Sequence, residues 1–184
     1  MLSIAAAIGC GSIVLCPNND VGDSRTSGRF YSDTLESLIE LAPLFEERMM
    51  SGLIEPLGFE ECSLRSKEIA VKAIRACGYE CYSVVHDTFH HYLGRDNLLY
   101  PEYTGLVHIS GVESDLPKKH LRDGDRILAG PDDILRSKKQ INELESYGYV
   151  GLYSLEPFAL EIRQLPKGDL IDRIKQSIEY LAAD

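Results

Sequence analysis

The sequence predicts an α/β fold of about five β/α units, the repeating unit of a (β/α)8 barrel. Short apolar segments rich in β-branched or aromatic residues alternate with amphipathic segments, at an average of about 35 residues per unit. Glycines stand between a helical segment and the following strand at Gly9, Gly78 and Gly148. Strands separated by helices in this way run parallel, with right-handed crossovers.

Five segments are expected to form strands. Each is apolar along most of its length instead of alternating, which is typical of parallel strands covered on both faces. They are Ser12–Pro17, Gly52–Leu57, Cys81–Asp87, Gly105–Gly111 and Gly151–Phe158.

Four segments show the spacing of amphipathic helices. They are Tyr31–Met50, Ser66–Cys77, Asp133–Tyr147 and Asp169–Leu181, and a short helix is expected near Asn97. The chain is expected to open inside a helix that ends at Gly9. Because a complete barrel has eight strands and about 250 residues, we expect residues 1–184 to form a single partial barrel domain that lacks about three units at the amino end. An open five-stranded sheet is the alternative.

Composition excludes several classes of function. The 19 basic and 29 acidic residues give a formal net charge of −10, which disfavours nucleic acid as a partner. No apolar segment approaches the roughly 20 residues that cross a bilayer, and we expect no membrane association and a cytoplasmic location. The five cysteines are odd in number and form no CxxC motif, so reduced thiols are expected.

Ionisable residues stand near the carboxyl ends of four consecutive expected strands. A charged group in a buried strand costs several kcal/mol unless it is paired or bound to a metal. Parallel strands of a barrel direct their carboxyl ends to one mouth, where active sites form. Two glutamates, an aspartate and a histidine there suit one divalent ion such as Mn²⁺, Co²⁺, Mg²⁺ or Zn²⁺. These residues are Glu55, Asp87, His108 and Glu156.

Other polar residues have ordinary structural interpretations. His86 faces away from Asp87 in an extended strand, and we interpret it as structural. His91 and His120 are expected on the surface or in loops. Arg126 ends the charged segment Arg-Asp-Gly-Asp-Arg, and spacing alone predicts a solvated side chain there.

Five segments together resemble the last five strands and loops of the xylose-isomerase-like barrel proteins, and among these the inosose (2-keto-myo-inositol) isomerases. The segments are GLIEPLGFEECSLRS, VHDTFHHYLG, LVHISGVE, LRDGDRILAGPDD and YSLEPF. The resemblance covers essentially the whole chain and about two thirds of a family member. It implies that Glu55, Asp87, His108 and Glu156 are metal ligands. It also implies that His90 binds substrate and that Arg126 contacts substrate oxygens.

The implied reaction is the isomerisation of a small keto-polyol or ketose. A divalent ion chelated by an α-hydroxyketone stabilises the enediolate that forms when the carbon-bound proton leaves. Glu55 and Glu156 can then act as base and conjugate acid on that intermediate. Asn18 or Asn19, after the first strand, could hydrogen-bond a polyol, although both could equally form a turn.

Three other functions stay open. The same residues could serve a 3-epimerase acting on a ketose or sugar phosphate. A phosphodiesterase of the endonuclease IV type shares the barrel but would need about three metals and more histidines. A truncated fragment could also be inactive or non-enzymatic. We expect that the isolated chain either self-associates through the exposed edges of the first and last strands or is the carboxy-terminal part of a longer protein.

Overall fold

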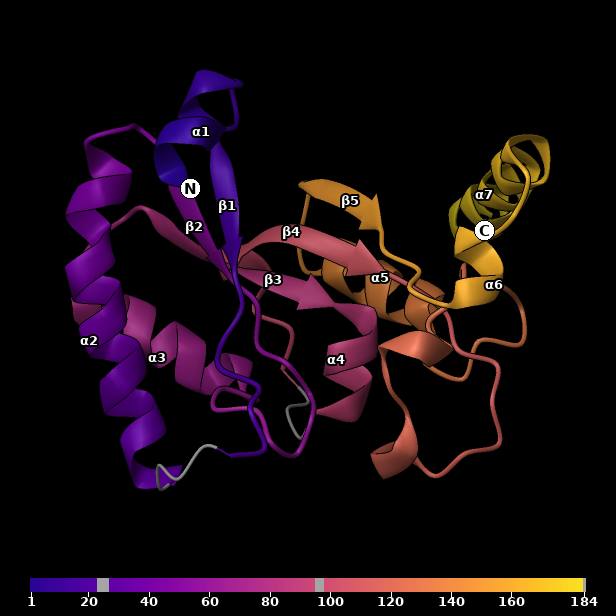
Figure 1. The fold of residues 1–184 in the computed structure, drawn as a ribbon, viewed down its shortest axis with the longest axis horizontal. Helices are drawn as coiled ribbons and strands as arrows, with labels where there is room; N and C mark the ends of the chain where they lie inside the picture. Colours follow the sequence, from indigo (N-terminus) through magenta and orange to yellow (C-terminus); the bar gives the residue numbers. More distant parts are fainter. Residues whose placement is uncertain (23–26, 95–97, 184) are drawn as a thin grey trace.

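The computed structural model describes residues 1–22, 27–94 and 98–183 of the chain and places five strands in one parallel sheet (Figure 1). The strands are β1 (Ser12–Leu15), β2 (Ser51–Ile54), β3 (Tyr82–Asp87), β4 (Thr104–Ile109) and β5 (Leu152–Leu155). Their order in the sheet is β1-β2-β3-β4-β5, and each neighbouring pair is parallel. The strand order therefore follows the chain without the reversal that defines a doubly wound open sheet.

All five expected strands are present, but several end earlier than the sequence predicts. β1 ends at Leu15 instead of Pro17, and β5 ends at Leu155 instead of Phe158. Glu55 and Glu156 consequently lie one residue beyond their strands. The prediction of a partial (β/α)8 barrel is confirmed.

Helices follow the strands along the chain. They are α1 (Leu2–Ala7), α2 (Ser27–Glu46), α3 (Lys67–Cys77), α4 (Thr88–Leu93), α5 (Ser137–Ser146), α6 (Leu160–Arg163) and α7 (Lys167–Ala182). Three 3-10 turns add Pro101–Tyr103, Lys118–His120 and Asp123–Asp125. The four long helices expected from the sequence are confirmed with shifted ends, as is a helix at the start of the chain. The short helix expected near Asn97 falls outside the described residues.

Local chemistry sets several of these boundaries. Ser66 caps α3 by accepting a hydrogen bond from the Ile69 amide, and Gly78 ends the helix with φ of 74°. A positive φ favours glycine because it has no Cβ. α5 begins four residues later than expected because the Asp133 carboxylate holds a preceding turn, where it accepts the Leu135 amide at 2.9 Å.

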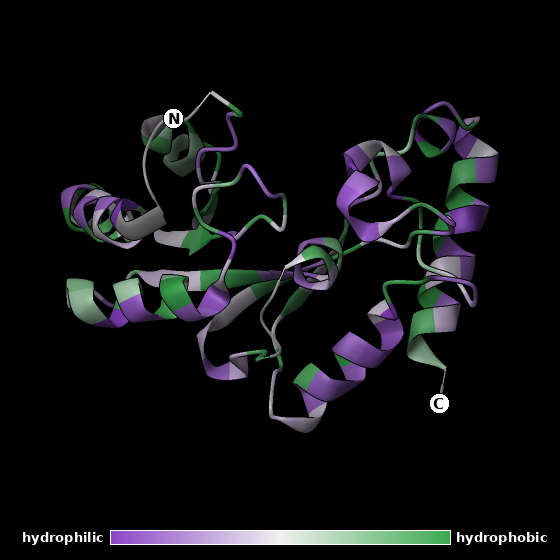
Figure 2. Cartoon of the chain, turned by 90° about the horizontal axis from the view of Figure 1, so that it is seen from below, coloured by the Kyte–Doolittle hydropathy of each residue, from purple (hydrophilic) through white to green (hydrophobic). Residues whose placement is uncertain are grey.

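The largest core cluster lies between the sheet and the helices α2 and α3, which pack against each other (Figure 1). Phe45 of α2 meets Tyr82 of β3 edge to face with ring centroids 5.7 Å apart, and the Tyr82 hydroxyl donates to the Leu38 carbonyl at 2.7 Å. The helices carry both hydrophilic and hydrophobic residues (Figure 2). Burial of their apolar stripes thus fixes the outer layer of the barrel.

The two ends of the sheet are open. Within the described residues β1 and β5 each pair with a single strand. Leu152 of β5 is 74% exposed and the preceding Val150 is 95% exposed. The expected exposed edges are therefore present. Among the described residues, no helix combines the length and apolar character that crossing a bilayer requires.

Candidate metal centre

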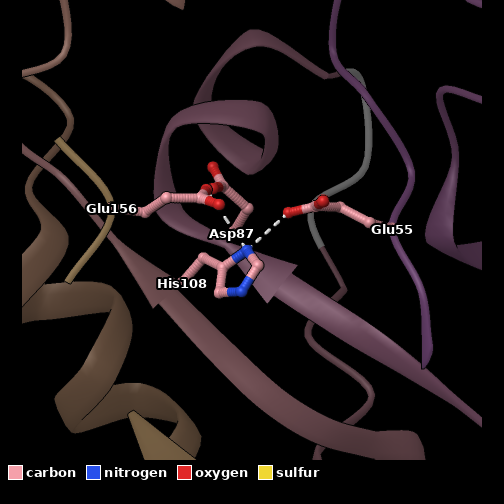
Figure 3. Close-up of side chains that lie close together, drawn as sticks. All are labelled: Glu55, Asp87, His108 and Glu156. Carbon is pink, nitrogen blue, oxygen red and sulfur yellow. Dashed lines mark hydrogen bonds and ion pairs between the residues drawn. The ribbon is translucent and has the colours of Figure 1, made fainter. Parts of the chain in front are cut away.

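The four ionisable residues named from the strand ends meet at one point of the sheet (Figure 3). One ligand atom from each of Glu55, Asp87, His108 and Glu156 can be chosen so that all lie within 4.8 Å of one another. The sheet register brings them together. Asp87 is directly opposite His108, the Glu55 amide donates to Leu15, and the Glu156 amide donates to Ile109.

His108 lies at the centre of the cluster. Its Nδ1 is 2.8 Å from Oε1 of Glu55 and 3.2 Å from Oε2 of Glu156. Burial alone would lower the pKa of His108, but the hydrogen bonds and negative charges of Glu156 and Glu55 outweigh it and raise the pKa to about 10. The imidazole is therefore protonated at neutral pH in the metal-free chain and holds the two glutamates together.

Glu156 is the most accessible member of the cluster. Its side chain is 28% exposed, against 7% for Glu55 and 8% for His108. Burial raises the pKa of Glu156, but the opposing effects of His108 and Arg126 are larger and lower it to about 2. Glu156 is thus ionised and is the member of the cluster most accessible to solvent.

Arg126 is a member of the same site and is not the solvated residue that spacing predicts. It is 1% exposed, and its Nη2 donates to Asp87 and, at 2.8 Å, to Glu156. Ser110 accepts from its Nε at 3.1 Å, and the guanidinium lies 4.8 Å from the Phe158 ring centroid. Arg126 therefore supplies permanent positive charge among the carboxylates.

His90 lies beside the cluster on α4. The Asp87 carboxylate caps this helix by accepting the His90 amide at 2.8 Å, which orients the first turn. The His90 ring accepts the Gly58 amide on Nδ1 at 3.2 Å. Burial lowers the pKa of His90, and Arg126 lowers it further against the opposing charge of Asp87. The neutral ring consequently carries its proton on Nε2, where it can donate.

The cluster fits a divalent cation. Ions of this kind hold carboxylate oxygens and imidazole nitrogens at about 2.0 to 2.6 Å, so ligand atoms on opposite sides of an ion are separated by about 4 to 5 Å. The spread of up to 4.8 Å matches that span. The three carboxylates carry one negative charge more than protonated His108 and Arg126 balance, which also favours a cation at this point. The donor set suits the ions expected from the sequence and does not select one of them.

Asn18 is not a member of the cluster. It is exposed, and with Cys16 it lines a cavity of about 340 Å³ next to α2. Cys16 contacts the cluster directly, because its thiol donates to Oε2 of Glu55 at 3.6 Å. Contact between Asn18 and substrate stays a prediction.

The remaining histidines lie outside the cluster. His86 is fully buried, where its two ring nitrogens contact Lys67 at 2.6 Å and Gln140 at 2.9 Å, consistent with a structural role. His91 was expected at the surface, but its Nδ1 lies 3.0 Å from the same Lys67 ammonium, and burial lowers its pKa to about 3. His91 is half-buried, so it lies only partly at the surface where it was expected. His120 is exposed, as expected.

Sequence reasoning missed several residues that complete the site. They are Ser110 and Asp123, which accept from Arg126, Cys16, which donates to Glu55, and Gly58, which donates to His90. The high density of charged residues in the segment that contains Asp123 and Arg126 was a sequence feature that could have indicated their role. The others gave no such signal, because a serine, cysteine or glycine in a loop has many ordinary explanations.

Comparison with known proteins agrees with this geometry. The family model described as the xylose isomerase-like TIM barrel matches residues 1–183. The chain belongs to the xylose isomerase-like TIM barrel family. A family member of solved structure, a xylose isomerase domain containing protein from Salmonella typhimurium LT2, is 34% identical with a TM-score of 0.90. The alignment covers 99% of this chain and 67% of that one.

Two further relatives of this xylose isomerase-like chain are more distant. The IolI protein, whose solved structure carries a zinc atom, is 21% identical over 98% of this chain and 66% of its own, with a TM-score of 0.86. The inosose isomerase of Bacillus velezensis is 27% identical over 153 residues, which are 80% of this chain and 54% of that protein. The chain thus spans about half the length of the curated relative it matches.

Proposed function

We propose that this chain carries the metal site and the proton-transfer groups of an isomerase that acts on small α-hydroxyketones, with a keto-inositol (inosose) as the substrate. The observation that carries the proposal is the convergence of Glu55, Asp87, His108 and Glu156 at the carboxyl ends of neighbouring parallel strands. The similarity to an inosose isomerase supports this choice of substrate.

Glu55, Asp87, His108 and Glu156 would hold the divalent ion. The ion would supply electrostatic stabilisation of the negative charge that develops on substrate oxygens when a carbon-bound proton is removed. Its binding requires the loss of the proton that His108 carries in the metal-free chain, since only the unprotonated nitrogen is a ligand.

Glu55 and Glu156 are the proposed proton carriers. They approach the centre from β2 and β5, on either side of His108. A carboxylate takes the proton from the hydroxyl-bearing carbon, and a carboxylic acid gives a proton to the neighbouring carbonyl carbon. Transfer of the hydroxyl proton to the former carbonyl oxygen completes the isomerisation, and proton exchange with water restores the two carboxyl groups. The more exposed Glu156 is positioned for the first contact with substrate, while the buried Glu55 is held by Cys16 and His108.

Three residues are proposed to position the substrate. His90 presents a donor on Nε2 because its Nδ1 is engaged by Gly58. Arg126 can stabilise substrate oxygens, provided that the ion takes over part of its contact with Asp87 and Glu156. Asn18 would contact a more distant hydroxyl.

Epimerisation is the second candidate reaction. If the proton returns to the opposite face of the same carbon, these residues would perform the 3-epimerisation of a ketose or sugar phosphate. Product analysis after incubation with inososes and with ketohexoses separates the two reactions, because an isomerase moves the carbonyl and a 3-epimerase does not.

Metal content tests the proposal. The chain is loaded with Mn²⁺, Co²⁺ or Zn²⁺, freed of excess ion, and measured by elemental mass spectrometry. We expect about one ion per chain in the wild type and in His120→Ala, which changes an exposed histidine, but loss of the ion in His108→Ala and Glu156→Gln. No bound ion in the wild type, or equal content in all four proteins, would contradict the proposed centre and favour the non-enzymatic fragment.

We also propose that the chain self-associates through β1 and β5. Both strands have backbone groups on an open side, and exposed apolar residues accompany β5. An unprotected parallel edge pairs readily with another strand.

A further inference from the structure

A basic pocket lies beside the proposed metal centre. Its cavity of about 260 Å³ is lined by four cationic side chains, those of Arg65, Lys118, Lys119 and Arg122. Glu60 is the acidic residue that lines it. The pocket therefore carries an excess of positive charge in a chain whose net charge is −10. A positively charged pocket in an acidic protein suggests an anionic ligand.

Among the described residues, the polar contacts of these cations are to backbone carbonyls instead of carboxylates. Arg65 donates through Nε and Nη2 to the Gly58 carbonyl, and Arg122 donates through Nη1 to the carbonyls of Lys119 and Leu121. Across residues 1–22, 27–94 and 98–183, the ion pairs of the structure include none of the four side chains. Other cations of the chain, such as Lys72 and Lys139, pair with a glutamate on the same helix.

Aromatic rings hold two of the cations over the pocket. The Lys118 ammonium lies 4.4 Å from the centroid of the Tyr92 ring, and the Arg122 guanidinium lies 5.7 Å from that of Phe59. Partial burial lowers the pKa of Lys118, and the positive charge of Arg65 lowers it further. Like charges are thus held near one another, and a bound anion would relieve that repulsion.

The pocket and the metal centre share a wall. Gly58 and Phe59 line the pocket on one side. On the other, the Gly58 amide donates to the His90 ring, and Phe59 packs edge to face against that ring at 5.1 Å. A ligand in the basic pocket is therefore one layer of residues away from a residue that we propose to bind substrate.

We propose that this pocket binds a phosphate group, through Arg65, Lys118, Lys119 and Arg122. Guanidinium and ammonium groups are the side chains that recognise phosphate, arginine through paired donors and lysine as a point charge. The phosphate has two possible sources: an ester on a phosphorylated substrate that extends past Phe59, or a free phosphate anion. The first source rests on the proposed isomerase function, and the second is independent of it.

Binding of inorganic phosphate to the chelator-treated chain at low salt tests the pocket without any contribution from a metal. Backbone amide signals in ¹H–¹⁵N spectra report the titration. The test variant is Lys118→Gln/Lys119→Gln, because neither ammonium donates to the backbone among the described residues. The matched control is Lys138→Gln/Lys139→Gln, another adjacent pair in which Lys138 also lies over a tyrosine ring, at 5.3 Å.

We expect saturable shifts around Gly94 and Lys119 in the wild type and the control. In the Lys118→Gln/Lys119→Gln variant the dissociation constant should rise at least about tenfold, which is about 1.4 kcal/mol. No saturable binding by the wild type, or equal weakening in both double variants, would overturn the proposal.

A second titration, on the metal-loaded chain, separates the two sources. If the pocket holds an ester phosphate, a ketohexose phosphate binds more tightly than the same ketohexose and than inorganic phosphate, and Lys118→Gln/Lys119→Gln removes the advantage. If it holds a free anion, inorganic phosphate and the ketohexose phosphate bind equally in the wild type. A ketohexose phosphate advantage that survives in the double variant would place the phosphate elsewhere and overturn the proposal. If the chain binds no metal ion but still binds inorganic phosphate, the isomerase proposal fails and the phosphate pocket stands.

Discussion

Replacing Arg126 with methionine tests the charge balance of the site. The guanidinium is 1% exposed and contacts the fully buried carboxylate of Asp87 as well as Glu156. Removing one partner of a buried ion pair costs about 3 to 5 kcal/mol, because it leaves charge buried without compensation. In the metal-free chain, Arg126→Met should therefore lower the free energy of unfolding by about that amount. Arg173→Met, which changes an exposed residue of α7, should change it by less than about 0.5 kcal/mol.

A divalent ion should reduce this deficit. An ion held by Asp87 and Glu156 would replace the positive charge that Arg126 supplied. Separately, an ion present at 100 times its dissociation constant stabilises the folded state of any variant that binds it by about 2.7 kcal/mol. Urea unfolding, with chelator and with excess Mn²⁺ or Zn²⁺, measures both effects. A loss below about 1 kcal/mol in chelator would show that the ion pairs do not stabilise the fold. A deficit for Arg126→Met that is as large with the ion as without it would refute the shared role of these carboxylates.

Three further predictions concern stability, site geometry and association. Because burial lowers the pKa of His91 to about 3 from 6.5, and lowers that of His86 as well, the folded state resists protonation. The stability that depends on these two neutral histidines should be complete above pH 6.5 and fall as the pH drops toward 5, with His91 contributing up to about 1.4 kcal/mol per pH unit. The slope should be smaller in His91→Gln, and an unchanged slope would contradict this. Gly58→Ala should weaken substrate binding more than metal binding, because the new Cβ would lie 2.6 Å from the carbonyl oxygen of His90. Isothermal titration calorimetry with the metal ion and with the substrate measures both affinities, and an equal loss of affinity for the two would refute the explanation. Sedimentation of the wild type at micromolar concentration should show oligomers. The variant Leu152→Lys on β5 should reduce their amount, whereas the control Leu116→Lys, in a loop, should not. A monomeric wild type would exclude edge pairing.

Local signals in the sequence were sufficient for the strands and for the candidate metal ligands. Apolar segments between helical patterns identified all five strands, and ionisable residues at four strand ends stood out because such positions are otherwise apolar. Glycines with positive φ marked the ends of the helices. The short helices α4 and α6 escaped prediction, since one turn or two of helix give too few residues for a periodic pattern.

The sequence by itself determined the parallel α/β architecture and the identity of Glu55, Asp87, His108 and Glu156 as candidate ligands, because both depend on patterns within single segments. Only the tertiary structure decided which groups neutralise them. The burial of Arg126 against Asp87 and Glu156, 39 and 30 residues away, depends on a loop that folds back over the sheet. The gathering of Arg65 with Lys118 and Arg122 likewise joins segments distant along the chain. The electrostatic interaction between two side chains depends on their distance in space, and no local pattern in the sequence encodes that distance for segments far apart along the chain.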